Sequence, residues 1–312
     1  MFVIANPAAR LVGRVALVGD VVEHLLEAGA SPRVALTQCP EDASRLAEEA
    51  VASGVNRIVV VGGDGTINEV VQAIAHSSVE MAVVPMGTGN VVGRYLKLRP
   101  GELREACHLA VHGVATPVDL GVMGTRYFVG MAGAGLDAEI VDKISRPWKE
   151  IVGWLAFAGQ AIQAVLTDEP RYLQLHFDED SFEGPMWGVL ISNLPEYTYR
   201  MELSSLARPD DGLLDFVILH DQGYAKLLDF GLDTFVWGES VEAHHAATVV
   251  QATKLQIEAD EPVKWQVDGE MMGVTPVVCR VEPAALQLVS DLPSNGVNGI
   301  HVDRSIGDDR QN

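Results

Sequence analysis

The sequence predicts an α/β protein in two parts: an N-terminal domain built on a parallel sheet and a C-terminal domain of antiparallel β-structure. Up to about residue 120, short β-branched runs alternate with amphipathic helical patterns, which is typical of a parallel sheet with right-handed crossovers. From Val118 onward, strand-like runs follow one another between Gly, Pro and Asp turns, which favours a sheet or sandwich. We therefore expect domains at 1–120 and 121–291 and a partly disordered tail at 292–312. The C-terminal end of the second domain is free to return to the first.

The composition is that of a folded protein and narrows the choice of partners. The chain has 312 residues, 48% of them hydrophobic and 21% charged, enough for a buried core in each domain. Its 22 Lys and Arg against 43 Asp and Glu give a formal net charge of −21, which argues against nucleic acid as a partner. Three scattered cysteines favour reduced thiols. With no signal peptide and no transmembrane segment expected, we predict a cytoplasmic protein.

The first elements set up the parallel sheet. The first helix carries its valines and leucines on one face and is closed by Gly29. The turn after the first strand, Asn6-Pro7-Ala8-Ala9-Arg10, has two small residues that would let a ligand approach the backbone, with an ordinary loop as the alternative. The second strand leads to Thr37. Strands are expected at 2–5 and 33–36, and helices at 15–28 and 41–52.

The third strand leads into the most informative stretch, Val59-Val60-Val61-Gly62-Gly63-Asp64-Gly65-Thr66-Ile67-Asn68-Glu69. The valines predict a buried strand, and the glycines mark a tight turn into a helix, in which Thr66 and Glu69 have the spacing of a capping box. Backbone N–H groups at such a turn form a cradle for a phosphate. Asp64 would repel that phosphate unless a divalent cation lay between them. The stretch therefore predicts a Mg–nucleotide site, with a glycine-rich structural turn as the alternative.

A second glycine turn has the same design. After an apolar strand at 81–85, the run Met86-Gly87-Thr88-Gly89-Asn90 opens another helix, with Asn90 as its N-cap. Two such turns on neighbouring strands would form opposite walls of one cleft, where open α/β sheets bind ligands. A helix at 101–111 and a strand at 115–118 complete the first domain.

The second domain is predicted from its turns. Two helices interrupt its strands, and the first, at 147–166, carries Trp148, Trp154 and Phe157. Core packing is the commoner explanation for such an aromatic face, and contact with lipid is the alternative. The second helix is expected at 223–237, and the strands at 126–131, 171–177, 187–192, 213–220, 248–258 and 263–268.

Taken together, these motifs resemble the diacylglycerol kinase catalytic-domain family, lipid kinases that share a nucleotide fold with NAD kinases and phosphofructokinases. The resemblance covers most of the chain and rests on the order and spacing of its motifs. The motifs are Asn6-Pro7, Thr37, Gly62 to Glu69, Pro85 to Asn90, Val118-Asp119, Gly133 to Ala138, Asp210 to Asp215, and Asp268-Gly269-Glu270.

The resemblance implies that ATP lies across the glycine turns, in a cleft between the domains. An acid network around Mg2+ and its waters maps onto Asp64 and Asp119, and a structural Mg2+ maps onto Asp211, with main-chain carbonyls near Arg208 and Leu213 as co-ligands. Without the family, Asp210-Asp211-Gly212 would be interpreted as a β-turn. The positions carried over as ATP contacts are Asn6, Pro7, Thr37, Gly62, Gly63, Asp64, Gly65, Thr66, Ile67, Asn68, Glu69, Gly87, Thr88 and Asn90.

The family also places its general base in the turn at Asp268-Gly269-Glu270, which by itself is an ordinary hairpin signal. Phosphoryl transfer to an alcohol needs a carboxylate that takes the hydroxyl proton, and Asp268 or Glu270 is assigned that role. One departure is Val91, where many family members carry Asp. Either an acidic member of the metal network is missing here, or the position varies harmlessly between subgroups.

The resulting hypothesis is an ATP- and Mg2+-dependent kinase that transfers the γ-phosphoryl group to a lipid hydroxyl, diacylglycerol-like or sphingoid. The lipid implies peripheral contact with the inner face of a membrane, and the helix at 148–166 is expected to form the acyl-chain wall. Two alternatives stay open: a kinase for a soluble acceptor such as NAD, and a non-catalytic nucleotide- or lipid-binding regulatory protein. No P-loop segment is present, which excludes that mechanism.

Overall fold

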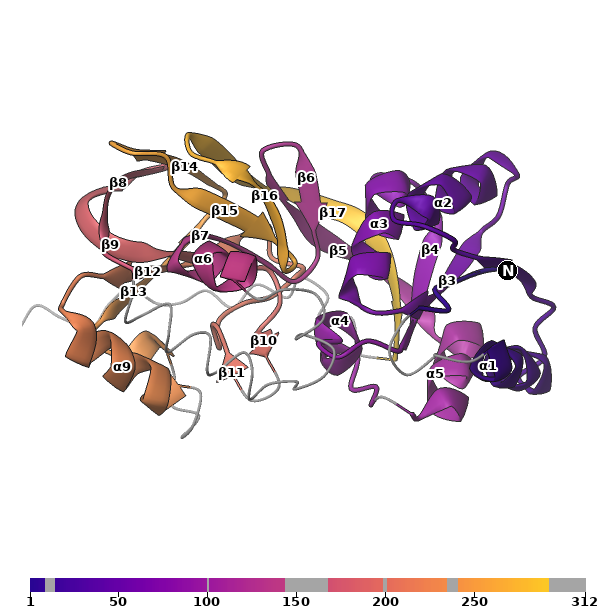
Figure 1. Cartoon of the computed structure of the whole chain (residues 1–312). Helices are drawn as coiled ribbons and strands as arrows, with labels where there is room; N and C mark the ends of the chain where they lie inside the picture. The colour runs from indigo at the N-terminus through magenta and orange to yellow at the C-terminus, as the bar shows by residue number, and fades with distance from the viewer. Residues whose placement is uncertain (9–14, 100, 144–167, 199–200, 235–240, 292–312) are drawn as a thin grey trace, which may run out of the picture.

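A computed structural model describes residues 1–8, 15–99, 101–143, 168–198, 201–234 and 241–291. In its N-terminal part, β1 (Phe2–Ala5), β2 (Arg33–Leu36), β3 (Arg57–Gly62) and β4 (Glu80–Pro85) form a parallel sheet in the order β2-β1-β3-β4. Helix α1 (Val15–Glu27) packs beside α5 (Leu103–His112), and α2 (Asp42–Ala52) beside α3 (Asp64–Ile74), on opposite sides of this sheet (Figure 1). The predicted α/β class is confirmed.

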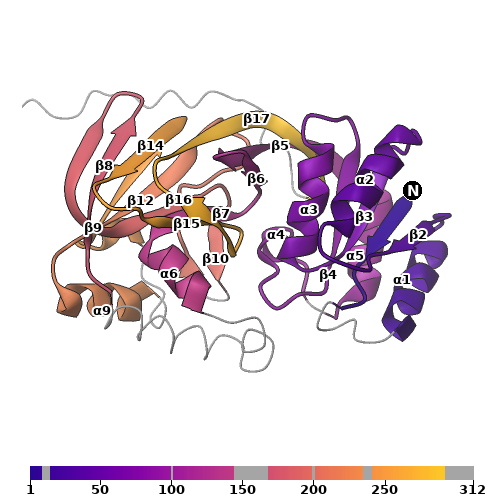
Figure 2. The ribbon, with the colours of Figure 1, turned by 45° about the horizontal axis from the view of Figure 1, so that its top comes forward.

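The C-terminal part is antiparallel and is centred on β9 (Ser181–Ser192), which pairs with β7 (Met131–Gly135), β8 (Arg171–Phe177) and β12 (Leu214–His220). Helices α6 (Leu136–Lys143) and α9 (Tyr224–Leu232) pack against it on a small apolar core (Figure 2). The remaining strands are β5 (Val114–Met123), β6 (Arg126–Phe128), β10 (Glu196–Thr198), β11 (Met201–Glu202), β13 (Ala247–Ala252), β14 (Lys254–Ala259), β15 (Lys264–Val267) and β16 (Glu270–Val274).

One long strand, β17 (Val277–Ser290), connects the two parts. Its first residues pair antiparallel with β14, and β5 runs antiparallel along most of its length. Near its end it pairs parallel with β4, with Leu288 opposite Met81. The parallel and antiparallel regions therefore belong to one continuous sheet.

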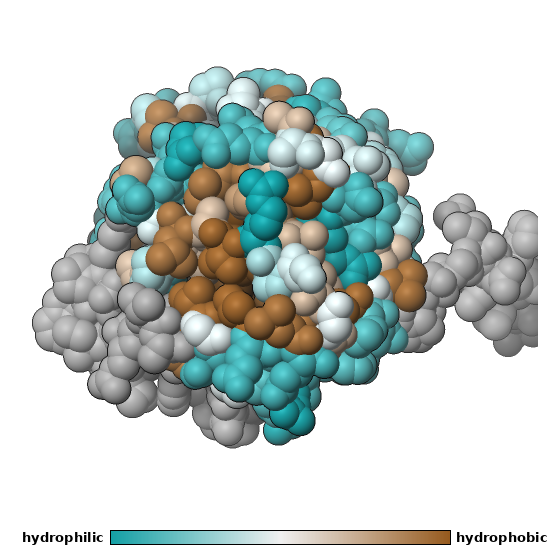
Figure 3. All heavy atoms as spheres, turned by 90° about the vertical axis from the view of Figure 1, so that its right-hand side faces the viewer, coloured by the Kyte–Doolittle hydropathy of each residue, from teal (hydrophilic) through white to brown (hydrophobic). Residues whose placement is uncertain are grey.

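Beyond its parallel partner β1, β2 has an outer side that no described residue pairs, and apolar side chains gather at this end of the molecule (Figure 3). Val34 and Leu36 of β2 and Leu26 of α1 are exposed. No helix in the described ranges has both the length and the apolar character that crossing a bilayer requires.

Two of the predicted strands are divided in the structure. The run 248–258 bends at Thr253, whose N–H and Oγ1 donate to Asp178 Oδ2 at 2.9 and 2.7 Å, so that β13 pairs with β12 while β14 pairs with β8 and β17. The run 126–131 is broken where the N–H groups of Val129 and Gly130 turn toward Asp268. The predicted helix at 147–166, the end of the helix predicted at 223–237, and the tail at 292–312 lie outside the described residues.

Candidate active site

The two glycine turns lie against each other at the carboxyl ends of β3 and β4. The Met86 N–H donates to the Gly62 carbonyl at 2.8 Å. A Cβ atom on Gly87 would lie 2.6 Å from the Gly63 Cα, which leaves no room for a side chain. The backbone is therefore bare at this edge of the sheet, which is the arrangement that a phosphate cradle requires.

The capping box predicted for Thr66 and Glu69 is wrong. Helix α3 begins at Asp64 after Gly63, and no side chain caps it. Thr66 Oγ1 instead accepts a hydrogen bond from Asn6 Nδ2 at 3.0 Å, and Glu69 Oε2 accepts one from the Ala43 N–H at 3.1 Å. Only glycines fit at this early start, because a Cβ on Gly62 would lie 2.8 Å from the Thr66 side chain and one on Gly63 would lie 3.1 Å from the Gly87 Cα. Thr66 and Glu69 thereby tie α3 to the turn after β1 and to α2.

Asn90 is the N-cap residue of α4 (Val91–Tyr95), as predicted, but its side chain closes the preceding turn and binds no N–H of the helix. Its Oδ1 accepts from the Gly87 N–H at 2.8 Å, and its Nδ2 donates to the Gly87 carbonyl at 2.7 Å. Asn90 adopts a left-handed φ of 49°, a conformation that asparagine tolerates.

The remaining predicted nucleotide contacts gather at the same edge of the sheet. Thr37 directly follows β2, and its N–H donates to the Ala5 carbonyl of β1 at 2.9 Å. Asn6 directly follows β1, and its N–H donates to the Val61 carbonyl of β3 at 2.9 Å. The structure thus brings Asn6, Thr37 and both glycine turns to the carboxyl ends of four adjacent strands, with Pro7 in the turn that Asn6 begins.

Asp64 links the two glycine turns. Its Oδ1 accepts from the Val91 N–H at 2.8 Å, and a Cβ atom on Gly89 would lie 2.5 Å from its Oδ2. Burial raises the pKa of Asp64, while these backbone donors and the Arg94 guanidinium act in the opposite direction. The carboxylate is therefore held at the junction where a phosphate-bound cation would compensate its charge.

Asp268 lies in the turn after β15, and four N–H donors surround its carboxylate. Oδ1 accepts from the backbone of Gly130 at 3.2 Å and Met131 at 3.1 Å. Oδ2 accepts from Asn68 Nδ2 at 2.8 Å and the Val129 backbone at 3.3 Å. Burial raises the pKa of Asp268 to about 6 and the Asp64 charge adds to the rise, although the donors oppose it. A carboxyl group with this pKa can accept a proton at neutral pH.

Glu270, two residues further on, is exposed and weakly held. Its Oε2 lies 4.0 Å from Arg126 Nη2, and its Oε1 lies 3.5 Å from the position of a Cβ on Gly65. Glu270 therefore approaches the first glycine turn from the same side as Asp268. The structure brings together Asp64, Asp268 and Glu270 from segments far apart in the sequence.

Asp119 belongs to a different group of carboxylates. Its Oδ2 accepts from the Gly212 N–H and its Oδ1 from the Ala284 N–H, both at 2.7 Å. It therefore holds the turn that carries Asp211, whose Oδ1 accepts from the Leu213 N–H at 3.0 Å. Among the described contacts, none joins Asp119 to Asp64 or Asp268, so the predicted acid network is divided between two places.

The loop around Asp211 has a donor set that fits a hard divalent cation. Burial raises the pKa of Asp211, and the Asp119 and Asp210 charges add to it. Burial raises the pKa of the neighbouring Asp215 to about 6, with Asp211 among the further causes. A cavity of about 280 Å³ opens beside them, lined by Ser205, Leu206, Arg208, Asp211 and Gln251. Carboxylate oxygens are the ligands that Mg2+ or Ca2+ prefers, and Asp211 supplies them here beside the cationic Arg208 side chain.

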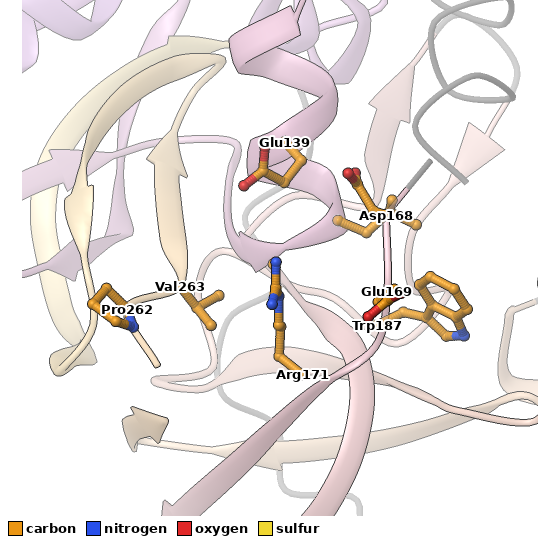
Figure 4. Close-up of a pocket in the computed structure, with 9 residues that line it drawn as sticks. Glu139, Asp168, Glu169, Arg171, Trp187, Pro262 and Val263 are labelled. Carbon is orange, nitrogen blue, oxygen red and sulfur yellow. The ribbon is translucent and has the colours of Figure 1, made fainter. Parts of the chain in front are cut away.

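A second, much smaller cavity of about 30 Å³ lies beside α6 and β15 (Figure 4). Its walls include Glu139, Asp168, Arg171 and Trp187, and no predicted site residue is among them. It has room for little more than a water molecule.

Sequence reasoning did not find the residues that hold the site together from outside the motifs. Gln72, on α3, binds the backbone of Tyr127 through both ends of its side-chain amide. Asn193 Nδ2 donates to the carbonyls of Asp119 and Val129 at 2.9 and 2.8 Å, joining the two carboxylate groups. A lone Gln or Asn carries no sequence signal for such a role.

Comparisons with known proteins agree with this architecture. Residues 1–123 match the model of the diacylglycerol kinase catalytic domain, and residues 130–290 match that of the YegS C-terminal NAD kinase beta sandwich-like domain. The chain is 26% identical over 259 residues to a diacylglycerol kinase of Bacillus subtilis (strain 168), covering 82% of this chain and 85% of that one. It is 30% identical over 261 residues to a protein of Chromohalobacter salexigens described as a probable YegS-like lipid kinase, covering 81% and 82%.

The fold also matches a solved structure from Bacillus anthracis str. Sterne assigned to a diacylglycerol kinase. The TM-score is 0.79 at 24% identity, and the match covers 93% of this chain and 94% of that one. This likeness supports the arrangement of the strands and helices.

Proposed function

The chain belongs to the diacylglycerol kinase catalytic-domain family, and from this we propose that it is an ATP- and Mg2+-dependent kinase that phosphorylates a lipid hydroxyl. The observation that carries the proposal is the meeting of two elements. The bare glycine turns lie on one side. On the other side lies Asp268, whose pKa is raised to about 6 and whose carboxylate accepts a hydrogen bond from Asn68 of α3.

ATP binds across the glycine turns in this proposal. The Gly63 N–H meets the phosphates because no side chain stands in front of it, while the Gly87 N–H is held by Asn90 Oδ1 and the second turn serves as the opposite wall. Asn6 and Thr37 border the same edge and contact the rest of the nucleotide. Asp64, Thr66 and Asn90 shape the turns through the hydrogen bonds described above and keep them in register.

Asp268 acts as the general base. The lipid oxygen forms a bond to the γ-phosphorus as the bond from that phosphorus to the leaving ADP oxygen breaks, and the hydroxyl proton passes to Asp268. The Val129 N–H makes the longest of the four contacts, at 3.3 Å, and it is the one that an incoming hydroxyl displaces most easily. Glu270 lies at the mouth of the same site and helps to orient the acceptor.

In this proposal each of the two clusters of carboxylates, the one at Asp64 and the one at Asp211, would hold a metal ion. Mg2+ bound with ATP would neutralise negative charge on the transferred phosphoryl group, and Asp64 is the carboxylate placed to hold it there. Asp211 would hold a second, structural ion together with carbonyls near Arg208 and Leu213. We assign Asp119 to that second group, because it holds the Asp211 turn through Gly212.

The lipid substrate implies contact with a membrane surface, on the cytoplasmic side. The chain is strongly acidic, so docking on an anionic bilayer needs a local patch of positive charge. Lys97, Arg99 and Arg104 are exposed after α4 and along α5, although Arg104 is already paired with Glu27 at 2.9 Å. This surface, close to the second glycine turn, is the part of the described molecule that we propose faces the membrane.

The proposal is tested by following phosphate transfer from radiolabelled ATP into mixed micelles that contain diacylglycerol, sphingosine or ceramide, with NAD as a soluble acceptor. Wild type, D268N and E270Q are compared, with and without Mg2+. Transfer to a lipid that requires Mg2+ and is lost in D268N supports the proposal.

The other outcomes separate the rivals. Transfer to NAD alone identifies a kinase for a soluble acceptor. ATP binding without transfer to any acceptor identifies a regulatory protein. Transfer that survives in D268N but not in E270Q keeps the lipid kinase and moves the base to Glu270.

A further inference from the structure

The side-chain amide of Gln72 binds one residue of the opposite part of the protein at two points. The Tyr127 N–H donates to Gln72 Oε1 at 3.1 Å, and Gln72 Nε2 donates to the Tyr127 carbonyl at 3.0 Å. Gln72 lies on α3 of the parallel part, while Tyr127 lies on β6, which leads into the antiparallel part. The Gln72 amide therefore binds the backbone of Tyr127 as a neighbouring strand would. The two hydrogen bonds also determine which end of the Gln72 amide is the oxygen.

Gln72 also fixes the side chain of Asn68, one helical turn earlier. Gln72 Nε2 donates to Asn68 Oδ1 at 3.1 Å and to its backbone carbonyl at 3.2 Å. With its oxygen engaged in this way, Asn68 must direct Nδ2 the other way, toward the Tyr127 carbonyl and Asp268 Oδ2, both at 2.8 Å. Rotating the Asn68 amide by half a turn would set its oxygen against a carbonyl and a carboxylate, which is repulsive.

Every donor to the Asp268 carboxylate is placed by this arrangement. Asn68 supplies one of the four, and the N–H groups of Val129, Gly130 and Met131 supply the other three. Those three residues follow closely on Tyr127 in the chain, so anchoring Tyr127 anchors the segment that presents them. Gln72 itself makes no described contact with Asp268.

We propose that Gln72 is a positioning residue for the transfer reaction: it orients Asn68 and anchors residues 127–131, and so sets the position of Asp268 relative to the helix that begins at Asp64. The inference rests on the proposed function, in which Asp268 takes the substrate proton. Its effect falls on turnover, because in the proposed function the phosphates lie at the glycine turns, with which Gln72 makes no described contact, and the Asn68 side chain is turned toward Tyr127 and Asp268.

The test uses two substitutions of Gln72 and one control in the full-length protein. Q72L removes both ends of the amide, whereas Q72E keeps an acceptor for the Tyr127 N–H but sets a carboxylate oxygen against Asn68 Oδ1 and the Tyr127 carbonyl. Q222L is the matched control, because the side-chain amide of Gln222 also donates to a main-chain carbonyl, that of His245 at 2.8 Å, and makes no described contact with Tyr127, Asn68 or Asp268. Lipid kcat and KM, ATP binding and the thermal midpoint are measured for each.

We expect Q72L and Q72E to lower kcat about 10- to 100-fold, since small misplacement of a reacting group has effects of this size. ATP affinity stays within about twofold, and Q222L keeps the wild-type kcat. In the double variant Q72L/N68A the loss is smaller than the product of the two single losses, because Gln72 acts in part through Asn68. Losses that multiply, or a wild-type kcat in folded Q72E, overturn the inference.

D268N separates a failure of the inference from a failure of the proposed function. If D268N is inactive while both Gln72 variants keep the wild-type kcat, only the positioning role is wrong. If D268N retains full turnover, or wild type phosphorylates no lipid, the proposed function fails and the inference fails with it. If Q72L does not fold, Q72E and the double-variant comparison built on Q72E decide the outcome.

Discussion

The backbone of Gly87 lies so close to that of Gly63 that a single added methyl group on Gly87 would come within 2.6 Å of the Gly63 Cα. We expect G87A to separate the two turns, weaken ATP binding and cost about 1–3 kcal/mol of stability, because backbone atoms cannot give way as a side chain can. ATP titration and urea unfolding measure the two effects.

G19A in α1 is the control, because nothing lies within 4 Å of the position of a Cβ on Gly19. There alanine should stabilise the helix by up to about 1 kcal/mol. Tight ATP binding by G87A would show that the contact between the turns is not needed.

The pKa of Asp268 predicts the pH dependence of turnover. Burial raises that pKa to about 6, and a general base works only when ionised. We therefore expect kcat to be constant above neutral pH and to fall as pH drops through about 6, approaching tenfold per pH unit. D268N should lose about 10²- to 10⁴-fold and the acid limb with it. A profile in wild type without an acid limb near this pH would assign the proton to another group.

Mg2+ should stabilise the protein through the Asp211 loop. Ligand binding to the native state at 100 times its dissociation constant adds about 2.7 kcal/mol, so the thermal midpoint should rise with Mg2+. D211N should abolish this rise. D210N is the matched control, because Asp210 is the exposed acidic neighbour in the same turn and does not line the cavity beside Asp211. Equal responses of the two variants would place the ion elsewhere.

Replacing Arg57 should lower the stability of the fold strongly, although Arg57 has no role in the proposed reaction. Its guanidinium donates to three carbonyls at the end of α5 and to Glu80 Oε2, at distances between 2.6 and 3.1 Å. R57A leaves these acceptors without their donor, and we expect a loss of about 3 kcal/mol in urea unfolding. R45A, which removes the ion pairs of the exposed Arg45 with Asp42 and Glu49 on α2, should change stability much less, because an exposed guanidinium gains little from such pairs. Similar losses in both variants would contradict this explanation.

The parallel half of the fold could be predicted closely, because local signals determine it. The valines before Gly62 form β3, and the glycines end it where a strand must turn into a helix. The first residue of a helix was harder to predict: Thr66 has the spacing of a cap, but the preceding glycines allowed the helix to begin first. Local spacing cannot show that a nearby asparagine, Asn6, will bind the Thr66 hydroxyl.

The site was predictable where it is made of turn motifs and not where it is made of contacts between distant segments. Asp64 was chosen from its glycine turn and Asp268 from the family resemblance, and in the structure the Asp64 charge is near enough to raise the pKa of Asp268. Their supports, Gln72 and Asn193, are single amides whose partners lie far away in sequence, so no periodicity marks them. The same limit applies to Asp119, whose partners Gly212 and Ala284 lie far from it in the chain and meet it only in the assembled sheet.

Because β17 pairs with strands of both halves, it limits where the protein can be truncated. A shortened chain that ends anywhere before Val277 lacks the strand that covers the outer edge of β4 and the partner of β5, even though every glycine-turn residue is still encoded. The nucleotide half would then expose an unsatisfied row of N–H and carbonyl groups, which promotes aggregation. Truncation series, domain swaps with relatives and split-protein reporters should therefore keep residues 277–290 with the N-terminal segment that they complete.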